Sequence, residues 1–295
     1  MTLIGSPTSP ISELGTRVLA RLGLSAPVAP SLDGLRALYR AWCERVPFDN
    51  VRKMIALRAA EPTPLPGDQA EDFLSAWLEH GTGATCWPSS NALYEVVRLA
   101  GFAAERLAGN MRDLGIVNHA SVRVRVQGQQ WLVDSSMLTN EPLLLGDDVF
   151  VGRDPVVPAE VERDAGSHVC WFTMAPSPDP FPCRLQPASV DHSFYSAAYE
   201  ASRDRGPFNQ RLYARRNRPG EVCVLFGNLR ITQTAAGVET RPLERDELCQ
   251  ALADDIGISR DMIERWKASG SLEASFEPPS GPRPPAPTRR PPSQR

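Results

Sequence analysis

The chain has 295 residues, of which 42% are hydrophobic, and its 32 Lys and Arg residues against 35 Asp and Glu give a net charge of -3. A chain of this length and composition can bury a large core in about two or three subdomains. The near-neutral charge argues against a nucleic-acid partner, and no basic amphipathic run suggests membrane binding. The start of the chain has no charged n-region or apolar h-region, and no stretch reaches membrane-spanning length, so we expect a cytoplasmic protein.

The first third of the chain is predicted to be largely helical. Residues 1–30 are rich in Pro and Ser around one short helical run and are expected to form a loosely ordered arm. Ser31 is a good N-cap for a helix that must end before Pro47. The turn that follows contains Phe48. A side chain in that position is either a core plug at a helix corner or a substrate contact, and the first is the simpler interpretation.

Residues 81–101 consist of a small-residue turn, a cysteine and a helix. Pro88 is tolerated only in the first turn of a helix, so the helix is predicted to begin beside Cys86 and to end at Gly101, which suits a left-handed C-cap. Backbone N–H groups and the macrodipole at a helix N-terminus favour an anion, which would make Cys86 a thiolate nucleophile. A small buried thiol fits this position equally well.

Beyond Gly101 the hydrophobic period changes to two, which predicts strands. A two-residue turn at residues 127 and 128 would place Val124 opposite Trp131 in a hairpin. In that register His119 and Asp134 lie on one face of the sheet as diagonal neighbours, roughly 7 to 8 Å apart at the backbone. A slip of one residue would send them to opposite faces.

The rest of the chain alternates strands and helices and then loses its apolar pattern. Several short strands in a Pro-rich section before residue 190 predict a small antiparallel barrel or sheet. Asp191 is a candidate N-cap for the next helix, and two or three strands and an amphipathic helix over 245–258 follow. Residues 277–295 are Pro- and Arg-rich, cannot build a core and are expected to be disordered.

Cys86, His119 and Asp134 together supply the side chains of a nucleophilic site. A thiolate needs a base to take and return its proton, and the base needs an acceptor on its other nitrogen. We expect Asp134 to hold Nδ1 of His119 and to leave Nε2 facing Cys86. Three such residues within about fifty positions form a weak pattern. The helix start at the cysteine and the strand ends at the other two make it more specific.

Six cysteines without a C-x-x-C pair and four histidines without H-x-x-x-H spacing indicate neither a disulfide framework nor a structural zinc site. No metal is therefore expected. The thiols other than Cys86 are interpreted as reduced and structural.

These motifs resemble those of the arylamine N-acetyltransferases. The run SLDGLRALYRAWCERVPFDNV resembles the family's helix and PFEN turn, and the small-residue turn with Cys86 resembles its nucleophile motif. His119 before an alternating strand and LVD at 132–134 resemble the segments that carry its catalytic histidine and aspartate. Gly-Pro-Phe at 206–208 and the helix RDELCQALADDIGI resemble its C-terminal lid domain. The resemblance runs in consistent order from about Ser31 to Gly257.

The resemblance implies an α+β fold: an N-terminal helical bundle, a central antiparallel β-barrel and a C-terminal α/β lid. Applied to this chain, the parts are an arm at 1–30, the bundle at 31–101, the barrel at 102–190, the lid at 191–276 and a tail at 277–295. A cysteine-proteinase-like triad would lie where the first two folded parts meet.

The activity that the resemblance implies is transfer of an acetyl group from acetyl-CoA, or of another acyl group from its CoA ester, through a cysteine thioester to an aromatic amine. The partner is then a small-molecule amine, and the reaction is ping-pong. Phe48, Ser136, Met137 and Phe208 would contact the substrate.

The sequence departs from the family pattern at four places, and two of them are Trp42, where the first helix often has histidine, and Trp87-Pro88-Ser89, in place of an aromatic-acidic-aliphatic segment. Thr82-Gly83-Ala84-Thr85 replaces the usual Arg-Gly-Gly-aromatic run, and Ser135-Ser136-Met137-Leu138 replaces Val-Gly-Phe-Gly after the aspartate. This last change suggests an acceptor more polar than a plain aniline. Two alternatives stay open: an amide synthase or transglutaminase-like enzyme that acts on a carrier-bound or peptide acyl group, and a non-catalytic binding protein.

Overall fold

The computed structural model describes residues 10–24, 28–175 and 177–278. Its helices are, in chain order, α1 (Pro10–Arg21), α2 (Leu32–Arg45), α3 (Val51–Leu57), α4 (Ala70–His80), α5 (Cys86–Leu99), α6 (His192–Arg205), α7 (Arg245–Ala251), the π-helical η1 (Leu252–Ile256), α8 (Arg260–Ala268) and α9 (Ser271–Phe276). The strands are β1 (Phe48–Asp49), β2 (Ala103–Met111), β3 (His119–Val126), β4 (Gln129–Val133), β5 (Leu143–Leu144), β6 (Phe150–Val151), β7 (Ala159–Asp164), β8 (Ser167–Met174), β9 (Ser177–Val190), β10 (Tyr213–Arg218), β11 (Glu221–Phe226), β12 (Leu229–Thr234) and β13 (Gly237–Pro242). None of the described helices is long and apolar enough to cross a membrane.

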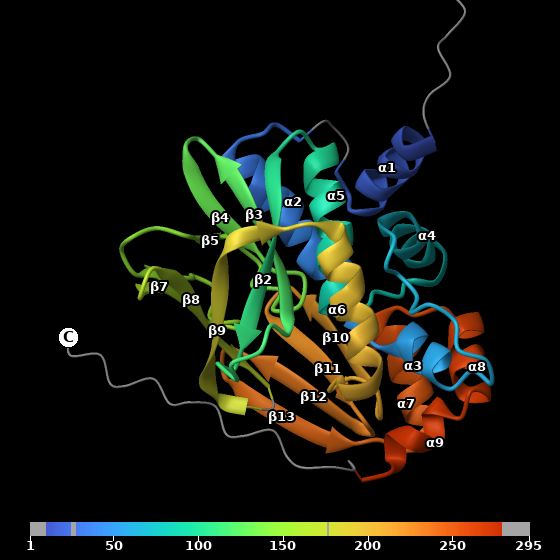
Figure 1. Cartoon of the computed structure of the whole chain (residues 1–295). Coiled ribbons are helices and arrows are strands. Elements are labelled where there is room, and N and C mark those ends of the chain that lie inside the picture. Colours follow the sequence, from blue (N-terminus) through green and yellow to red (C-terminus); the bar gives the residue numbers. More distant parts are fainter. Residues whose placement is uncertain (1–9, 25–27, 176, 279–295) are drawn as a thin grey trace, which may run out of the picture.

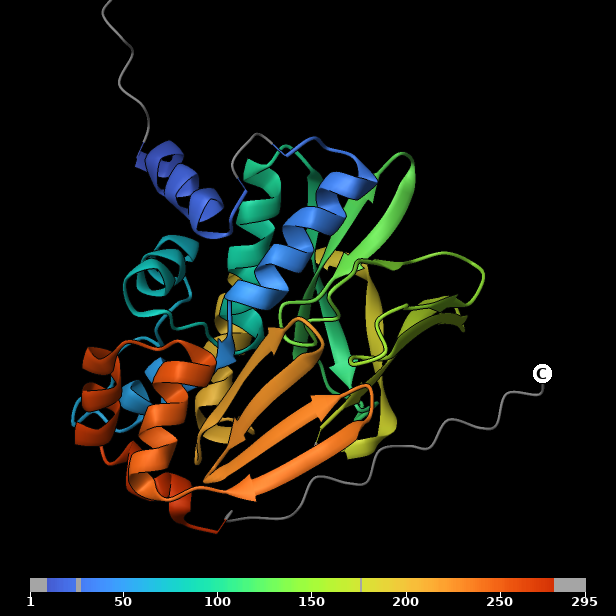
Figure 2. The same ribbon diagram turned by 180° about the vertical axis from the view of Figure 1, so that it is seen from behind.

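The N-terminal part is helical, as predicted. The Ser31 hydroxyl accepts from the Gly34 N–H at 3.2 Å and begins α2, which ends before Pro47. Its apolar face is fully buried and includes Tyr39 and Trp42. α2 lies beside α5 near the boundary of the two sheets (Figures 1 and 2). These two helices therefore bring the N-terminal core up to the sheets.

Residues 10–24 are packed more firmly than their Pro- and Ser-rich composition indicates. α1 lies against α4, and its Val18 and Leu22 are fully buried in the main core. The remaining positions of the predicted arm, 1–9 and 25–27, lie outside the described residues, and so does the predicted tail from 279 onward.

Eight antiparallel strands form a nearly closed barrel in the order β5-β4-β3-β2-β9-β8-β7-β6. The sheet curls until β5 lies against β6 and β7, which confirms the predicted antiparallel barrel. The hairpin register is also confirmed, because Val124 pairs with Trp131. Its turn has positive φ at both central residues, Gln127 and Gly128, as a two-residue hairpin loop requires.

A second antiparallel sheet has the order β1-β10-β11-β12-β13 (orange in Figure 1, apart from β1). Its edge strand β1 comes from the helical part, and Phe48 pairs with Arg215 of β10. Helices α7 to α9 build a separate core with this sheet, and α3 packs against α8. The structure therefore couples the first and last thirds of the chain directly. Together, the helices and two sheets give the expected α+β fold.

Candidate active site

Cys86 is the first residue of α5, as the Pro88 position predicted. The helix is fixed by its buried stripe and ends before Gly101, whose φ of +87° is the left-handed value expected after a C-cap. The Cys86 side chain is buried, with a residue exposure of 8%. Its Sγ lies 4.0 Å from the carbonyl oxygen of Asn118, the residue before His119. The helix N-terminus therefore presents the thiol to the start of β3.

The turn before Cys86 is held by Asp49. Its Oδ2 accepts from Gly83 N at 2.5 Å, its Oδ1 accepts from Val51 N at 3.0 Å, and its own N–H donates to Ala84 O at 3.3 Å. Gly83 is required there, because a Cβ would lie 1.7 Å from the Pro47 carbonyl oxygen. Burial raises the pKa of Asp49 to about 6, and the two N–H bonds oppose this rise. This aspartate thus fixes the turn that precedes Cys86.

His119 and Asp134 meet as the hairpin register predicted. His119 begins β3, Asp134 follows β4, and both are buried. The prediction was wrong about the imidazole nitrogen: it is Nε2 that lies 2.7 Å from Asp134 Oδ2, not Nδ1. Nδ1 is therefore the nitrogen left for Cys86. Because the register fixes only the sheet face, it could not determine how the ring is turned.

The surroundings of His119 favour its charged form. Burial alone lowers the pKa of this imidazole, but the charge and hydrogen bond of Asp134, joined by those of Cys86, prevail and raise it to about 10. The ring is therefore an imidazolium at neutral pH, which stabilises a neighbouring thiolate. In contrast, burial raises the pKa of the Cys43 thiol to about 12 and that of Cys223 to about 11. Both are inert thiols at neutral pH.

The Asp134 carboxylate and its backbone are fixed by neighbouring groups. Oδ1 accepts from the N–H groups of Ser136 and Met137, both at 2.9 Å. The Tyr39 hydroxyl donates to Asp134 O at 2.8 Å and accepts from Asp134 N at 3.1 Å and from Thr139 N at 3.2 Å. The loop after β4 is thereby tied to α2.

Ser90 ties together the three elements that carry these side chains. One turn after Cys86, its hydroxyl donates to Ala120 O at 2.9 Å in β3 and meets Ser135 Oγ at 2.8 Å. Ser90 and the role of Tyr39 were not predicted from the sequence. The available signal was a hydroxyl on an otherwise apolar helix face, and such a group requires a partner when it is buried.

The four expected substrate residues fall into two groups. The Phe48 ring lies 5.2 Å from that of Phe208 and 5.7 Å from that of Tyr213, in edge-on contacts. Ser136 and Met137 lie in the Asp134 loop, but the Met137 side chain packs into the barrel core. Phe48, Phe208 and Tyr213 thus form an aromatic cluster. The place of Tyr213 in it was not predicted from the sequence.

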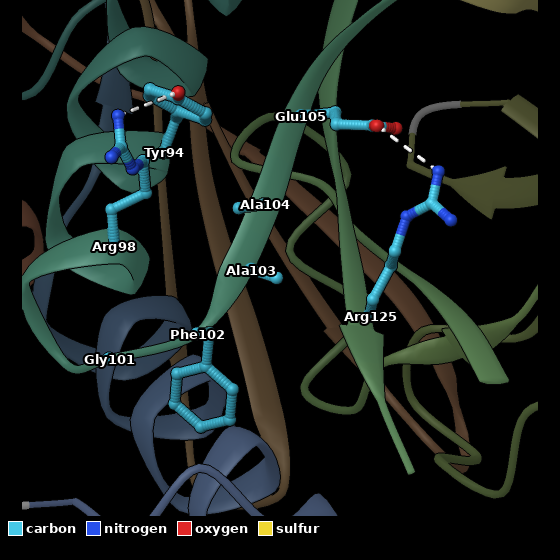
Figure 3. Close-up of a pocket in the computed structure, with 8 residues that line it drawn as sticks. All are labelled: Tyr94, Arg98, Gly101, Phe102, Ala103, Ala104, Glu105 and Arg125. Carbon is cyan, nitrogen blue, oxygen red and sulfur yellow. Dashed lines mark hydrogen bonds and ion pairs between the residues drawn. The ribbon is translucent and has the colours of Figure 1, made fainter. Parts of the chain in front are cut away.

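One surface hollow lies away from this site. It has a volume of about 520 Å³ and is found between the C-terminal end of α5 and the strands β2 and β3 (Figure 3). It holds no thiol, and two of its arginines are engaged: Arg98 with Tyr94, and Arg125 with Glu105. Among the described residues, no group of three or more His, Cys, Asp or Glu side chains is placed to hold a metal ion.

The helical part, nearly closed barrel and α/β part define the fold of the arylamine N-acetyltransferases. The enzyme from Mycobacterium marinum matches with a TM-score of 0.77 and 18% identity over 89% of this chain and 100% of its own. The enzyme from Mycobacterium abscessus matches at 0.73 and 20%, over 92% and 100%, and that from Salmonella typhimurium at 0.73 and 16%, over 87% and 98%. No curated protein matches the chain.

The family follows from the sequence itself. The profile of the N-acetyltransferase family matches residues 31–264, which is most of the chain. The protein therefore belongs to this family and is an acyltransferase.

Proposed function

We propose that the protein transfers an acyl group, in the simplest case acetyl, from acyl-CoA through a thioester on Cys86 to an amine acceptor. The observation that carries this proposal is the position of Cys86 at the start of α5, beside the His119–Asp134 pair held at 2.7 Å. A solved M. marinum arylamine N-acetyltransferase in complex with CoA matches 87% of this chain with a TM-score of 0.75. That relative supports CoA esters as donors.

In the first half-reaction, the Cys86 thiolate attacks the thioester carbonyl of the donor. A bond forms between that carbon and Cys86 Sγ, and the bond from the carbon to the CoA sulfur breaks. His119, charged because its pKa is raised to about 10, gives its proton to the departing CoA thiolate. Acyl-Cys86, neutral His119 and free CoA result.

In the second half-reaction, the amine nitrogen attacks the acyl carbon. Its bond to Cys86 Sγ breaks, and His119 takes the proton that the nitrogen loses. An amide leaves, and the thiolate–imidazolium pair is restored. Asp134 keeps the ring in place throughout and stabilises its charged form.

The acceptor is proposed to be a small-molecule amine. It would lie against the aromatic cluster of Phe48, Phe208 and Tyr213, and beside Ser136 of the Asp134 loop. We take 31–101, 102–190 and 191–276 as the three parts that surround it, and the cytoplasm as its location. We propose neither a nucleic-acid nor a membrane partner.

Steady-state transfer tests the proposal. Purified protein is incubated with acetyl-CoA and an arylamine while CoA release and the N-acetylated amine are quantified. The expected result is equal amounts of both products and parallel double-reciprocal lines, the signature of a ping-pong route. Reaction with carrier-linked thioesters but not with CoA esters would favour the amide-synthase alternative instead. No transfer from either donor class would favour the other alternative, a non-catalytic binding protein.

A further inference from the structure

Arg215 is a buried cation without an ionic partner in the part of the chain that the structure describes. It lies in β10 with 1% of its surface exposed. Its Nη1 reaches the Ser136 carbonyl oxygen at 3.4 Å and Met174 Sδ at 2.6 Å, while Nε and Nη2 contact no acceptor among the described residues. The charge of Asp134 acts on it, but both Asp134 oxygens are already bound to other donors.

Burying a guanidinium in this state is costly. An unpaired buried charge loses several kcal/mol of hydration, which proteins normally offset with a paired anion. Burial accordingly lowers the pKa of Arg215. Arg230, two strands away in the same sheet, has such a paired anion: its Nε donates to Asp255 Oδ2 at 2.8 Å and its Nη2 donates to Asp255 Oδ1 at 3.3 Å. In Arg215, the same two nitrogens have no acceptor among the described residues.

Arg215 lies beside the loop that follows Asp134. Arg215 pairs with Phe48 across β1 and β10, and it contacts Ser136, whose N–H holds the Asp134 carboxylate. The Ser136 hydroxyl is also buried and has no hydrogen-bond partner within the described residues. An arginine edge and a hydroxyl, both unsatisfied and both beside the catalytic loop, form a set that a planar monoanion would satisfy.

We propose that Arg215 is a specificity residue that binds a carboxylate carried by one of the two substrates. The proposal rests on the acyl transfer proposed above and narrows its substrate class. The carboxylate would be either the terminal group of a dicarboxylic acyl unit on the donor or a substituent of the amine acceptor. A carboxylate matches the two parallel N–H groups of Nε and Nη2 and neutralises the single charge.

Two matched comparisons test this assignment. In the donor arm, malonyl-CoA and succinyl-CoA are compared with acetyl-CoA, using one neutral amine. In the acceptor arm, 4-aminobenzoate is compared with 4-aminobenzamide, using acetyl-CoA. The measured quantity is the ratio of kcat/KM for the carboxylated and neutral members, so general losses in a variant cancel. We expect a ratio of about ten or more in one arm, and that arm identifies the substrate that carries the carboxylate.

Three variants link that ratio to Arg215. Arg215→Met should bring the kcat/KM ratio to within about threefold of unity. Arg215→Lys keeps the charge but loses the two parallel N–H donors of the guanidinium, and should give an intermediate ratio. Arg230→Met removes the paired arginine of the same sheet and should keep the wild-type ratio.

Two results would overturn the assignment: wild-type ratios near one in both arms, or a preference that survives both Arg215 substitutions. If the neutral substrates react while the ratios stay near one, the carboxylate proposal alone fails. If wild-type protein transfers nothing in either arm, the proposed acyl transfer fails with it.

Discussion

The charge on His119 determines what Cys86 can do. Because the pKa of this imidazole is raised to about 10, the ring should stay charged across neutral pH. Asp134→Asn removes the carboxylate charge that favours the imidazolium, so we expect it to slow the alkylation of Cys86 by iodoacetamide at pH 7 about tenfold or more. Peptide mass spectrometry measures the rate. Equal rates in wild type and Asp134→Asn would contradict this role of the imidazolium.

The same residue links stability to pH. A folded-state pKa of about 10 lies above the ordinary 6.5, so the contribution of His119 is fully present below about pH 6.5 and is lost as pH rises through 10. Urea unfolding at a series of pH values should therefore show a stability difference between wild type and Asp134→Asn that shrinks as the pH rises from about 6.5 to 10. A stability difference that grows with pH would contradict the raised pKa of His119.

At the residue scale, sequence predicted the pairing of His119 with Asp134 but not the state of Arg215. The pairing follows from local information, namely the side-chain alternation and the two-residue turn. The state of Arg215 depends on which groups of β8 and of the Asp134 loop reach it across the fold. Nothing in the run YARRNR shows that Nε and Nη2 of Arg215 have no acceptor among the described residues, while Arg216 bonds the carbonyl oxygens of Glu44 and Ile256.

At the scale of elements, the turn before α5 and strand β1 position the thiol through close backbone contact. Gly83→Ala would force a methyl group against the Pro47 carbonyl oxygen, so we expect a loss of about 1–3 kcal/mol in the free energy of unfolding and slower alkylation of Cys86. Chemical denaturation and the labelling assay measure the two effects. Gly146→Ala, whose added Cβ meets only ordinary contacts, is the control. Equal behaviour of the two variants would refute this role for Gly83.

Elements with a complete local signal were predicted well. α5 had a proline in its first turn, a regular apolar stripe and a glycine after its end, and it begins at the expected residue. The short helical run of α1 was predicted, but its Pro- and Ser-rich surroundings indicated a loose arm, whereas Leu14, Val18 and Leu22, spaced four residues apart, pack it on the core. Its attachment depends on α4, about fifty positions away, and no local pattern reports such a contact.

For the whole molecule, Asn50 joins the first and last thirds. Its Nδ2 donates to Phe208 O at 2.9 Å and to Arg211 O at 2.7 Å, and its Oδ1 accepts from Tyr213 N at 2.9 Å. Asn50→Ala leaves these groups without partners and should cost about 2–4 kcal/mol of unfolding free energy. Asn110→Ala, which removes an exposed bond to Asp113, should cost under about 0.5 kcal/mol.

Because β1 completes the sheet of the last third, we expect both Asn50→Ala and wild type to unfold in one transition followed by circular dichroism. Separate transitions for the helical and C-terminal parts would show that this coupling is weak. The order of the three parts was predictable from the resemblance to the family. The shared strand was not, because a two-residue strand has no pattern of its own.

The central claim is that Cys86 carries the acyl group, and intact-mass spectrometry after incubation with acetyl-CoA tests it most directly. We expect one acetyl group per chain, mapped to Cys86, absent from Cys86→Ser and retained in Cys249→Ser, which removes a half-buried thiol on α7. An acetyl group that persists in Cys86→Ser, or wild-type protein that stays unmodified by a panel of acyl-CoAs, would contradict it.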